Sequence, residues 1–226
     1  MAMIPQNQKT DGKSDHYQRI IDMEVEKYYR ENLPQIIHDT GIPDGYRFDR
    51  ETGKELTKPV VEHVFEWVWL NRDRNLLLTG DTGIGKSTSL CFAALKMVME
   101  RKKVRYVKLR NLLAEWREAK KSDSPYADEG FFRFIAELDL MVIDEAVDRA
   151  KTTESGQEMM YELLDRIADG EIKTKIWLAG NFRSGSIVDL FGDDAPVRRR
   201  IEENFLCAGI TQGKVEQFHV WNGRVG

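Results

Sequence analysis

The chain has 226 residues, of which 41% are hydrophobic and 32% charged, and its formal net charge is −4. This length suits one α/β domain with a small appendage better than two full domains. The charge balance excludes a global basic field for nucleic acid, so any such contact must come from a local patch. Two distant cysteines without a CxxC pair exclude a zinc knuckle and a disulfide framework. With no apolar leader and no apolar stretch of membrane-spanning length, we expect a cytoplasmic protein without a membrane partner.

The first forty residues predict a helical appendage. Apolar side chains recur at helical spacing over residues 15–30, and Pro34 then interrupts the pattern. Turn signals follow from Gly41 onward. We therefore expect residues 1–40 to form an N-terminal segment that can dock a partner, and residues 41–226 to form the main domain. Alternatively, the apolar stripe packs on the main domain itself.

The main domain shows helix and strand patterns in alternation, which predicts a parallel sheet covered by helices. The expected helices cover residues 59–70, 87–102, 111–121, 154–169 and 195–205. The expected strands cover residues 75–79, 104–109, 138–144 and 175–181, with one or two closing strands between 206 and 220. Residues 122–128 are expected to form a loop.

The stretch "GDTGIGKST" follows an expected strand and opens an expected helix, which is the context that the pattern G-x-x-x-x-G-K-[ST] requires. Its glycines let backbone N–H groups turn inward around a β-phosphate, and the helix N-terminus favours an anion. We expect Lys86 to reach the β- and γ-phosphates and Ser87 to bind Mg²⁺. The predicted nucleotide-binding residues are Gly80, Asp81, Thr82, Gly83, Ile84, Gly85, Lys86, Ser87 and Thr88.

Two further strands end in polar residues. Asp144 and Glu145 follow the apolar stretch "LDLMVI", and Asn181 ends "KIWLAGN". We expect Asp144 to hold the Mg²⁺ water shell, and Glu145 to orient and deprotonate a water that attacks the γ-phosphate. Asn181 is expected to contact the γ-phosphate or that water. The alternatives are two solvated carboxylates and an asparagine that only forms a turn.

Arg198, Arg199 and Arg200 stand in a row at the head of the last predicted helix, where the helix dipole disfavours cations. This placement favours an arginine finger that completes the site of a neighbouring subunit, and so implies self-association. The alternative is a solvated basic turn or pairing with nearby carboxylates.

The blocks "VRYVKL", "LDLMVIDEA", "IWLAGN" and "LFGDDAPVRRRIEENF" resemble, in order and spacing, the DnaC/DnaI group of replicative helicase loaders. The related transposition helper ATPases of the IstB type share this layout. The resemblance covers about residues 40–220 and implies an AAA+ ATPase that uses ATP and Mg²⁺. The implied fold is a three-layer α/β P-loop NTPase, a RecA-like parallel sheet flanked by helices without a C-terminal helical lid.

The resemblance also assigns residue roles. Asn181 matches sensor 1, although the family often has Thr or Ser where this chain has Gly180. The finger of such proteins precedes Leu, Ile or Met, which favours Arg200, with Arg199 as the fallback.

The partners that the resemblance implies are a replicative DNA helicase, single-stranded DNA and further copies of the chain. Stacking platforms between basic side chains are what single strands require. The candidate strip for that contact consists of Lys108, Arg110, Trp116, Arg117, Lys120 and Lys121.

Three rival functions remain open at this point. One is a transposition regulator that marks target DNA and recruits a transposase. Another is an inhibitor or hijacker of a host replication factor. A small-molecule kinase is disfavoured, because no Arg-rich lid follows the P-loop helix and the Asp144-Glu145 pair suits water as the acceptor.

Overall fold

The structure, a computed structural model, describes residues 12–43, 59–121, 127–146, 154–181, 195–211 and 214–217. It divides into two compact units, Met1–Ile37 and His38–Gly226. Within the described residues, no helix has both the length and the apolar character needed to cross a bilayer.

The described residues of the N-terminal unit lie in helix α1, Gly12–Asp39, which continues through Pro34. The predicted interruption at this proline is therefore wrong. A proline inside a helix removes one backbone hydrogen bond but does not have to end the helix. The helix ends instead at Asp39, shortly before Gly41, whose φ of 78° is left-handed and whose N–H donates to the His38 carbonyl oxygen at 3.1 Å. A left-handed glycine just beyond the last turn is a common helix terminator.

In the part of the main unit that the structure describes, six strands form one sheet in the order β2-β3-β4-β1-β5-β6. All neighbouring strands are parallel except β6, which is antiparallel to β5. The strands are β1 (Asn75–Gly80), β2 (Val104–Lys108), β3 (Leu140–Asp144), β4 (Lys175–Gly180), β5 (Phe205–Thr211) and β6 (Lys214–Gln217). The register pairs Thr79 with Gly180 and Lys108 with Asp144, so the carboxyl ends of these strands lie at one edge of the sheet.

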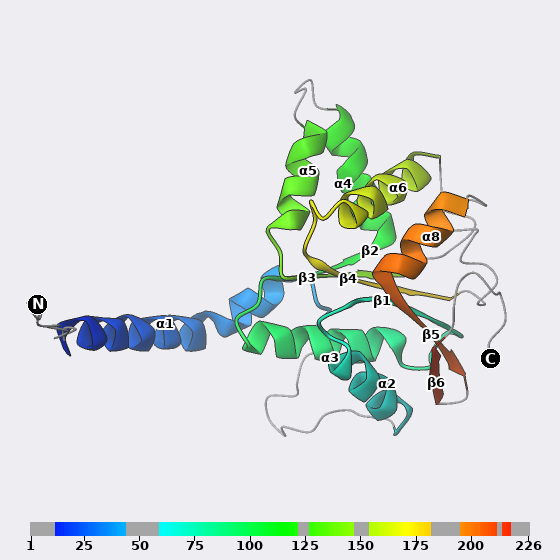
Figure 1. Ribbon diagram of the computed structural model, residues 1–226. Coiled ribbons are helices and arrows are strands. Elements are labelled where there is room, and N and C mark those ends of the chain that lie inside the picture. The colour runs from blue at the N-terminus through cyan, green and yellow to red at the C-terminus, as the bar shows by residue number, and fades with distance from the viewer. Residues whose placement is uncertain are drawn as a thin grey trace, which may run out of the picture. The chain divides into compact units, whose positions relative to one another are not determined.

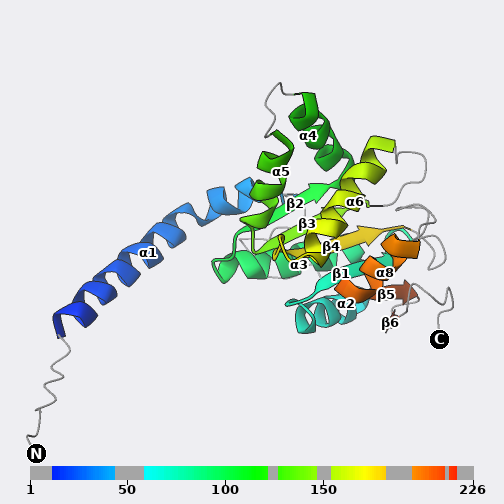
Figure 2. The same ribbon diagram turned by 45° about the horizontal axis from the view of Figure 1, so that its top comes forward.

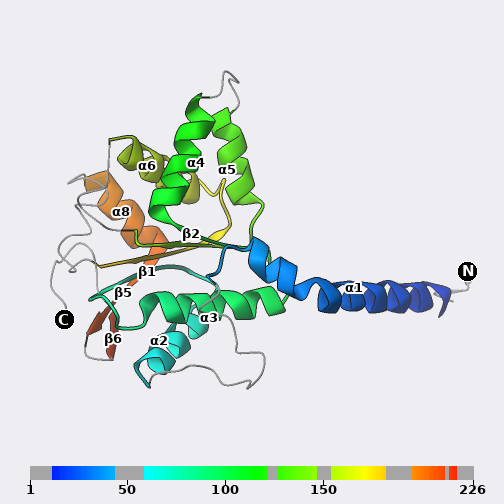
Figure 3. The same cartoon turned by 180° about the vertical axis from the view of Figure 1, so that it is seen from behind.

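Helices cover both faces of this sheet. On one face lie α2 (Pro59–Leu70) and α3 (Lys86–Met99). On the other face lie α4 (Leu109–Lys121), α5 (Ala127–Ala136), α6 (Glu154–Ala168) and α8 (Ala195–Asn204), as Figures 1 and 3 show. Figure 2 shows α4 and α5 over the β2 end of the sheet and α8 over the β5 end. The three layers confirm the predicted α/β fold class.

Helix α5 was missed by the sequence analysis, which expected a loop up to residue 128. The helix begins at Ala127, and its residues Phe132 and Ile135 are buried at 1% and 0% exposure. Their spacing of three residues in "FFRFIA" is a helical signal that identifies this element.

The segment after α1 covers the edge strand β2. The Tyr106 N–H donates to the Thr40 carbonyl oxygen at 2.7 Å, and Ile42 is 1% exposed. A Cβ at Gly41 would lie 2.5 Å from the Tyr106 carbonyl oxygen, so only glycine fits this approach. Residues 40–42 therefore occupy an edge that would otherwise expose unpaired backbone groups.

The close approach of Gly41 to Tyr106 leads to predictions for the free energy of unfolding of three glycine variants, measured by urea denaturation. Gly41→Ala should lower the free energy of unfolding by about 2 kcal/mol or more, because strain at positive φ adds to a backbone clash. Gly170 also has a positive φ, 76°, but a Cβ there would lie in open space. Gly170→Ala should therefore lower the free energy of unfolding by only about 1 kcal/mol. Gly130→Ala, in open space on α5, should gain up to about 1 kcal/mol. Equal losses for Gly41→Ala and Gly170→Ala would contradict the clash.

Candidate nucleotide-binding site

The glycine-rich loop connects β1 to α3. Gly80, Gly83 and Gly85 have φ values of 140°, 82° and 98°, a backbone conformation that residues other than glycine rarely adopt. A Cβ at Gly80 would also lie 2.5 Å from the Ile210 carbonyl oxygen on β5. Helix α3 begins at Lys86 without a side-chain cap, so the N–H groups of its first turn remain available to an anion. The loop therefore has the backbone conformation that its sequence predicts.

Lys86 lies inside this loop and is 5% exposed. Its Nζ donates to the carbonyl oxygens of Gly80 and Asp81 at 2.7 and 2.8 Å, and to Asn181 Oδ1 at 2.8 Å. Burial lowers the pKa of Lys86, while the charges of Asp144 and Asp81 oppose that change. Phosphate oxygens of a bound ligand can replace these three acceptors and keep the buried ammonium group hydrogen-bonded.

Asn181 comes directly after β4, the strand next to β1. Besides accepting from Lys86, its amide nitrogen donates to Thr82 Oγ1 at 3.0 Å. The structure therefore brings Asn181 against the P-loop. Its role as sensor 1 stays a prediction.

Asp144 ends β3 and is 5% exposed. One carboxylate oxygen, Oδ1, accepts the N–H of Glu145 at 2.8 Å. The other, Oδ2, accepts the hydroxyl of Tyr106 from the neighbouring strand. Burial, reinforced by Cys91 and Asp144, raises the pKa of Tyr106 well above its usual range, so the hydroxyl keeps its proton and donates. Sequence reasoning missed Tyr106, because its contact depends on the register between β2 and β3.

Glu145 lies in a different environment from its neighbour. Its φ of 52° is left-handed, which is uncommon outside glycine and is found at functional sites. Its side chain is 53% exposed, and Oε1 pairs with Lys108 Nζ at 2.5 Å. The carboxylate expected to act on water is thus accessible to solvent and engaged by one cation.

The residues expected to hold Mg²⁺ fit that ion chemically. Ser87 is partly buried in the first turn of α3, and Asp144 lies close enough for its charge to oppose the burial that lowers the pKa of the adjacent Lys86. Hydroxyl and carboxylate oxygens are the hard ligands that Mg²⁺ takes beside phosphate oxygens and water.

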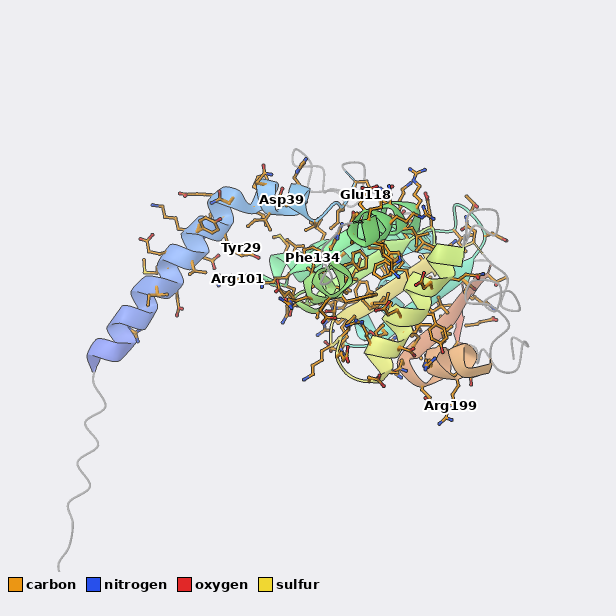
Figure 4. The ribbon with its side chains drawn as sticks, turned by 90° about the horizontal axis from the view of Figure 1, so that it is seen from above. Tyr29, Asp39, Arg101, Glu118, Phe134 and Arg199 are labelled. Carbon is orange, nitrogen blue, oxygen red and sulfur yellow. The ribbon has the colours of Figure 1, made fainter. Side chains whose placement is uncertain are left out.

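The arginines are the fourth to sixth residues of α8, which begins at Ala195, so they pass from its first turn into its second. Arg200 pairs with Asp165 on α6 at 2.5 Å, and its guanidinium carbon lies 5.0 Å from the centre of the Tyr161 ring. Arg199 is 76% exposed, pairs with Glu203 and projects outward from α8 (Figure 4). The structure thus places Arg200 in contact with its own α6, and its role as a finger stays a prediction.

The predicted DNA strip does not form a stacking platform. Trp116 is 0% exposed and packs against the rings of Phe131 and Phe132, with centroids 5.2 and 5.3 Å away. That part of the prediction is wrong, because the tryptophan belongs to the core beneath α4 and α5. Lys120 lies over the Trp116 ring and pairs with Glu158 at 2.7 Å.

Comparison with protein families places the P-loop and the strands around it in a known group. Residues 38–196 match the model of the IstB-like ATP binding protein family. The chain belongs to this family. Its membership and its fold confirm the resemblance to AAA+ proteins of the DnaC and IstB group.

Solved structures share the fold of this IstB-like chain. The DnaC helicase loader is 15% identical with a TM-score of 0.55, and the match covers 75% of this chain and 100% of that one. DnaI is 16% identical with a TM-score of 0.52, covering 74% and 92%. AMPPCP-bound DnaA from Aquifex aeolicus is 16% identical with a TM-score of 0.55, covering 75% and 51%. The chain spans about half of that DnaA and 44% of a DNA replication initiation factor. No curated protein matches the sequence.

The Lys108–Glu145 ion pair predicts the effect of Lys108→Met on the ATP hydrolysis in which Glu145 is expected to act. An exposed pair contributes about 0.2–1 kcal/mol, and losing it frees the carboxylate for water, so basal hydrolysis should rise by up to about fivefold. Phosphate release at saturating ATP measures this effect. Lys102→Met, which removes a pair with Asp139 at 3.6 Å, is the matched control and should leave the rate unchanged. A slower Lys108→Met enzyme would show instead that Lys108 orients Glu145 productively.

Proposed function

We propose that this IstB-like chain binds ATP with Mg²⁺ and hydrolyses it. The observation that carries the proposal is the convergence of Lys86 and Asn181 on the glycine loop, with Asp144 close enough to act on Lys86. Lys86 and the loop N–H groups would bind the phosphates, and Ser87 and Asp144 would hold the metal ion. Metal-bound ATP supplies the phosphoanhydride bond that is broken.

In this proposal, Glu145 orients the attacking water and accepts its proton at the exposed carboxylate. Asn181 positions the same water or the γ-phosphate through its side-chain amide. General base catalysis of this kind contributes about 10²–10⁴-fold to a rate.

We further propose that the active form is an oligomer in which Arg200 reaches the site of a neighbouring copy. Such a finger must first leave its pair with Asp165. Arg199 is the fallback, because it is the more exposed of the two.

Hydrolysis by mixed variants tests both proposals. Glu145→Gln should keep nucleotide binding and lose at least about 100-fold in hydrolysis, because it lacks the base. Arg200→Ala should hydrolyse ATP slowly on its own. It should regain activity when mixed with Glu145→Gln, because Arg200 of a Glu145→Gln copy then completes the site of an Arg200→Ala copy, whose Glu145 is intact. Arg199→Ala is the matched comparison. If Arg200→Ala hydrolyses ATP like the wild type at every protein concentration, Arg200 is not the finger.

For the use of the ATP cycle, we propose the loading of a replicative helicase onto single-stranded DNA, with α1 as the docking segment. The fold likeness to the DnaC helicase loader, which extends over all of that chain, supports this reading. The alternative is a transposition helper that marks target DNA and recruits a transposase, and the family match supports it.

Two measurements separate these functions. A loader should prefer single-stranded over duplex DNA in salt-controlled binding and should retain a replicative helicase in pull-downs from its native host. Ile21→Asp or Tyr28→Asp, at α1 positions that are 54% and 61% exposed, should abolish that retention. Leu70→Asp, at an 80% exposed position on α2, is the control. Duplex preference and capture of a transposase would support the transposition helper instead.

A further inference from the structure

Tyr106 connects three elements around the nucleotide-binding site. It lies in the middle of β2, is 5% exposed, and donates its hydroxyl hydrogen to Asp144 Oδ2 on β3. The thiol of Cys91 on α3 lies close enough to the same hydroxyl to contribute to the raised pKa of Tyr106. Cys91 stands one helical turn after Ser87, so both lie on the same face of α3. Tyr106 therefore lies between the two elements that supply the metal-binding oxygens.

The backbone of Tyr106 is fixed as well. Its N–H is bonded to the Thr40 carbonyl oxygen at 2.7 Å, and its strand is paired with β3 in parallel register. Cys91 is 0% exposed. A hydroxyl held by a rigid strand and a packed ring has little freedom to follow a moving carboxylate.

Both oxygens of Asp144 are consequently engaged, Oδ1 by the Glu145 N–H and Oδ2 by the Tyr106 hydroxyl. Of these two donors, only the hydroxyl comes from another strand. It is therefore the contact that fixes the rotation of the carboxylate relative to α3. Partners that hydrogen-bond a metal ligand in this way set its orientation, and losing them typically costs 10–100-fold in metal affinity.

We propose that Tyr106 is a positioning residue that orients the Asp144 carboxylate toward the Mg²⁺ of the bound nucleotide. This inference rests on the proposed nucleotide site. Strand β2 then contributes to metal binding through the Tyr106 hydroxyl, in addition to what the glycine loop and the carboxylates at the end of β3 provide.

The test is Mg²⁺-linked nucleotide binding by Tyr106→Phe, which keeps the ring and removes the hydroxyl. A fluorescent, non-hydrolysable ATP analogue is titrated into the full chain at a series of Mg²⁺ concentrations and in EDTA. The Mg²⁺ concentration at half-maximal tight binding should rise by roughly tenfold, while the affinity in EDTA stays at the wild-type value. A merely structural hydroxyl would change the unfolding midpoint but not this Mg²⁺ dependence.

Thr174→Val is the matched control. Its hydroxyl is also buried, at 3% exposure, and donates to the carbonyl oxygens of Ile135 and Leu138 at 2.6 and 2.9 Å. Thr174 precedes β4 and so lies at the opposite edge of the sheet from the glycine loop. This variant should lose stability and keep the wild-type Mg²⁺ midpoint.

The outcomes separate the two proposals. If the wild type binds no nucleotide, the proposed function fails. If the wild type binds with Mg²⁺ dependence and Tyr106→Phe has the same midpoint, the positioning role of Tyr106 fails alone. Should Tyr106→Phe not fold, Cys91→Ala tests the same hydroxyl from α3 and should raise the midpoint by a smaller factor, whereas Cys91→Ser should not. A wild-type midpoint for Cys91→Ala would then overturn the proposal.

Discussion

The site depends on the stabilisation of one buried cation. Lys86 is 5% exposed, and an ammonium group at such depth is unfavourable unless oxygens surround it. Two of its three oxygens come from the loop backbone, which curves only because glycines hold positive φ, and the third comes from Asn181. Asn181 reaches Lys86 because β4 pairs with β1 in parallel register. The order of strands in the sheet is therefore a condition for keeping this lysine charged in the absence of phosphate.

The acidic half of the site shows how two adjacent carboxylates acquire different chemistry. Asp144 is buried with both oxygens hydrogen-bonded, whereas Glu145 turns out of the strand through a left-handed conformation and is half exposed. A fixed, fully engaged carboxylate suits a metal ion, since it needs no reorganisation on binding. A solvent-accessible one suits proton transfer from water. The single change in backbone conformation at Glu145 produces this division.

The sequence predicts those parts of the molecule whose signal is local. The glycine loop, the apolar strands and the polar residues at their ends follow from motif and periodicity, whereas the contact between Lys86 and Asn181 is a finding of the structure. Contacts across the sheet could not be predicted, because a residue such as Tyr106 meets Asp144 only through the register of two strands distant in sequence. Trp116 was misassigned for a related reason: its basic neighbours indicate a solvated helix face, whereas α5, which the sequence analysis missed, covers its ring. The interruption predicted at Pro34 was wrong, because a proline removes one hydrogen bond from a helix and does not have to end it.

As the proposed finger, Arg200 would connect the chemistry of the site to assembly, and magnitudes decide whether its contact with Asp165 opposes that role. Both side chains of that pair are about a third exposed, at 27% and 32%, so the pair contributes on the order of 1 kcal/mol. An arginine finger is worth about 10³–10⁵ in rate, which corresponds to about 4–7 kcal/mol of transition-state stabilisation. The intrachain contact is therefore too weak to prevent transfer of Arg200 to a neighbouring γ-phosphate. It is strong enough to keep the guanidinium against α6 in a single copy, so that an assembled neighbour would change both the position of Arg200 and the rate.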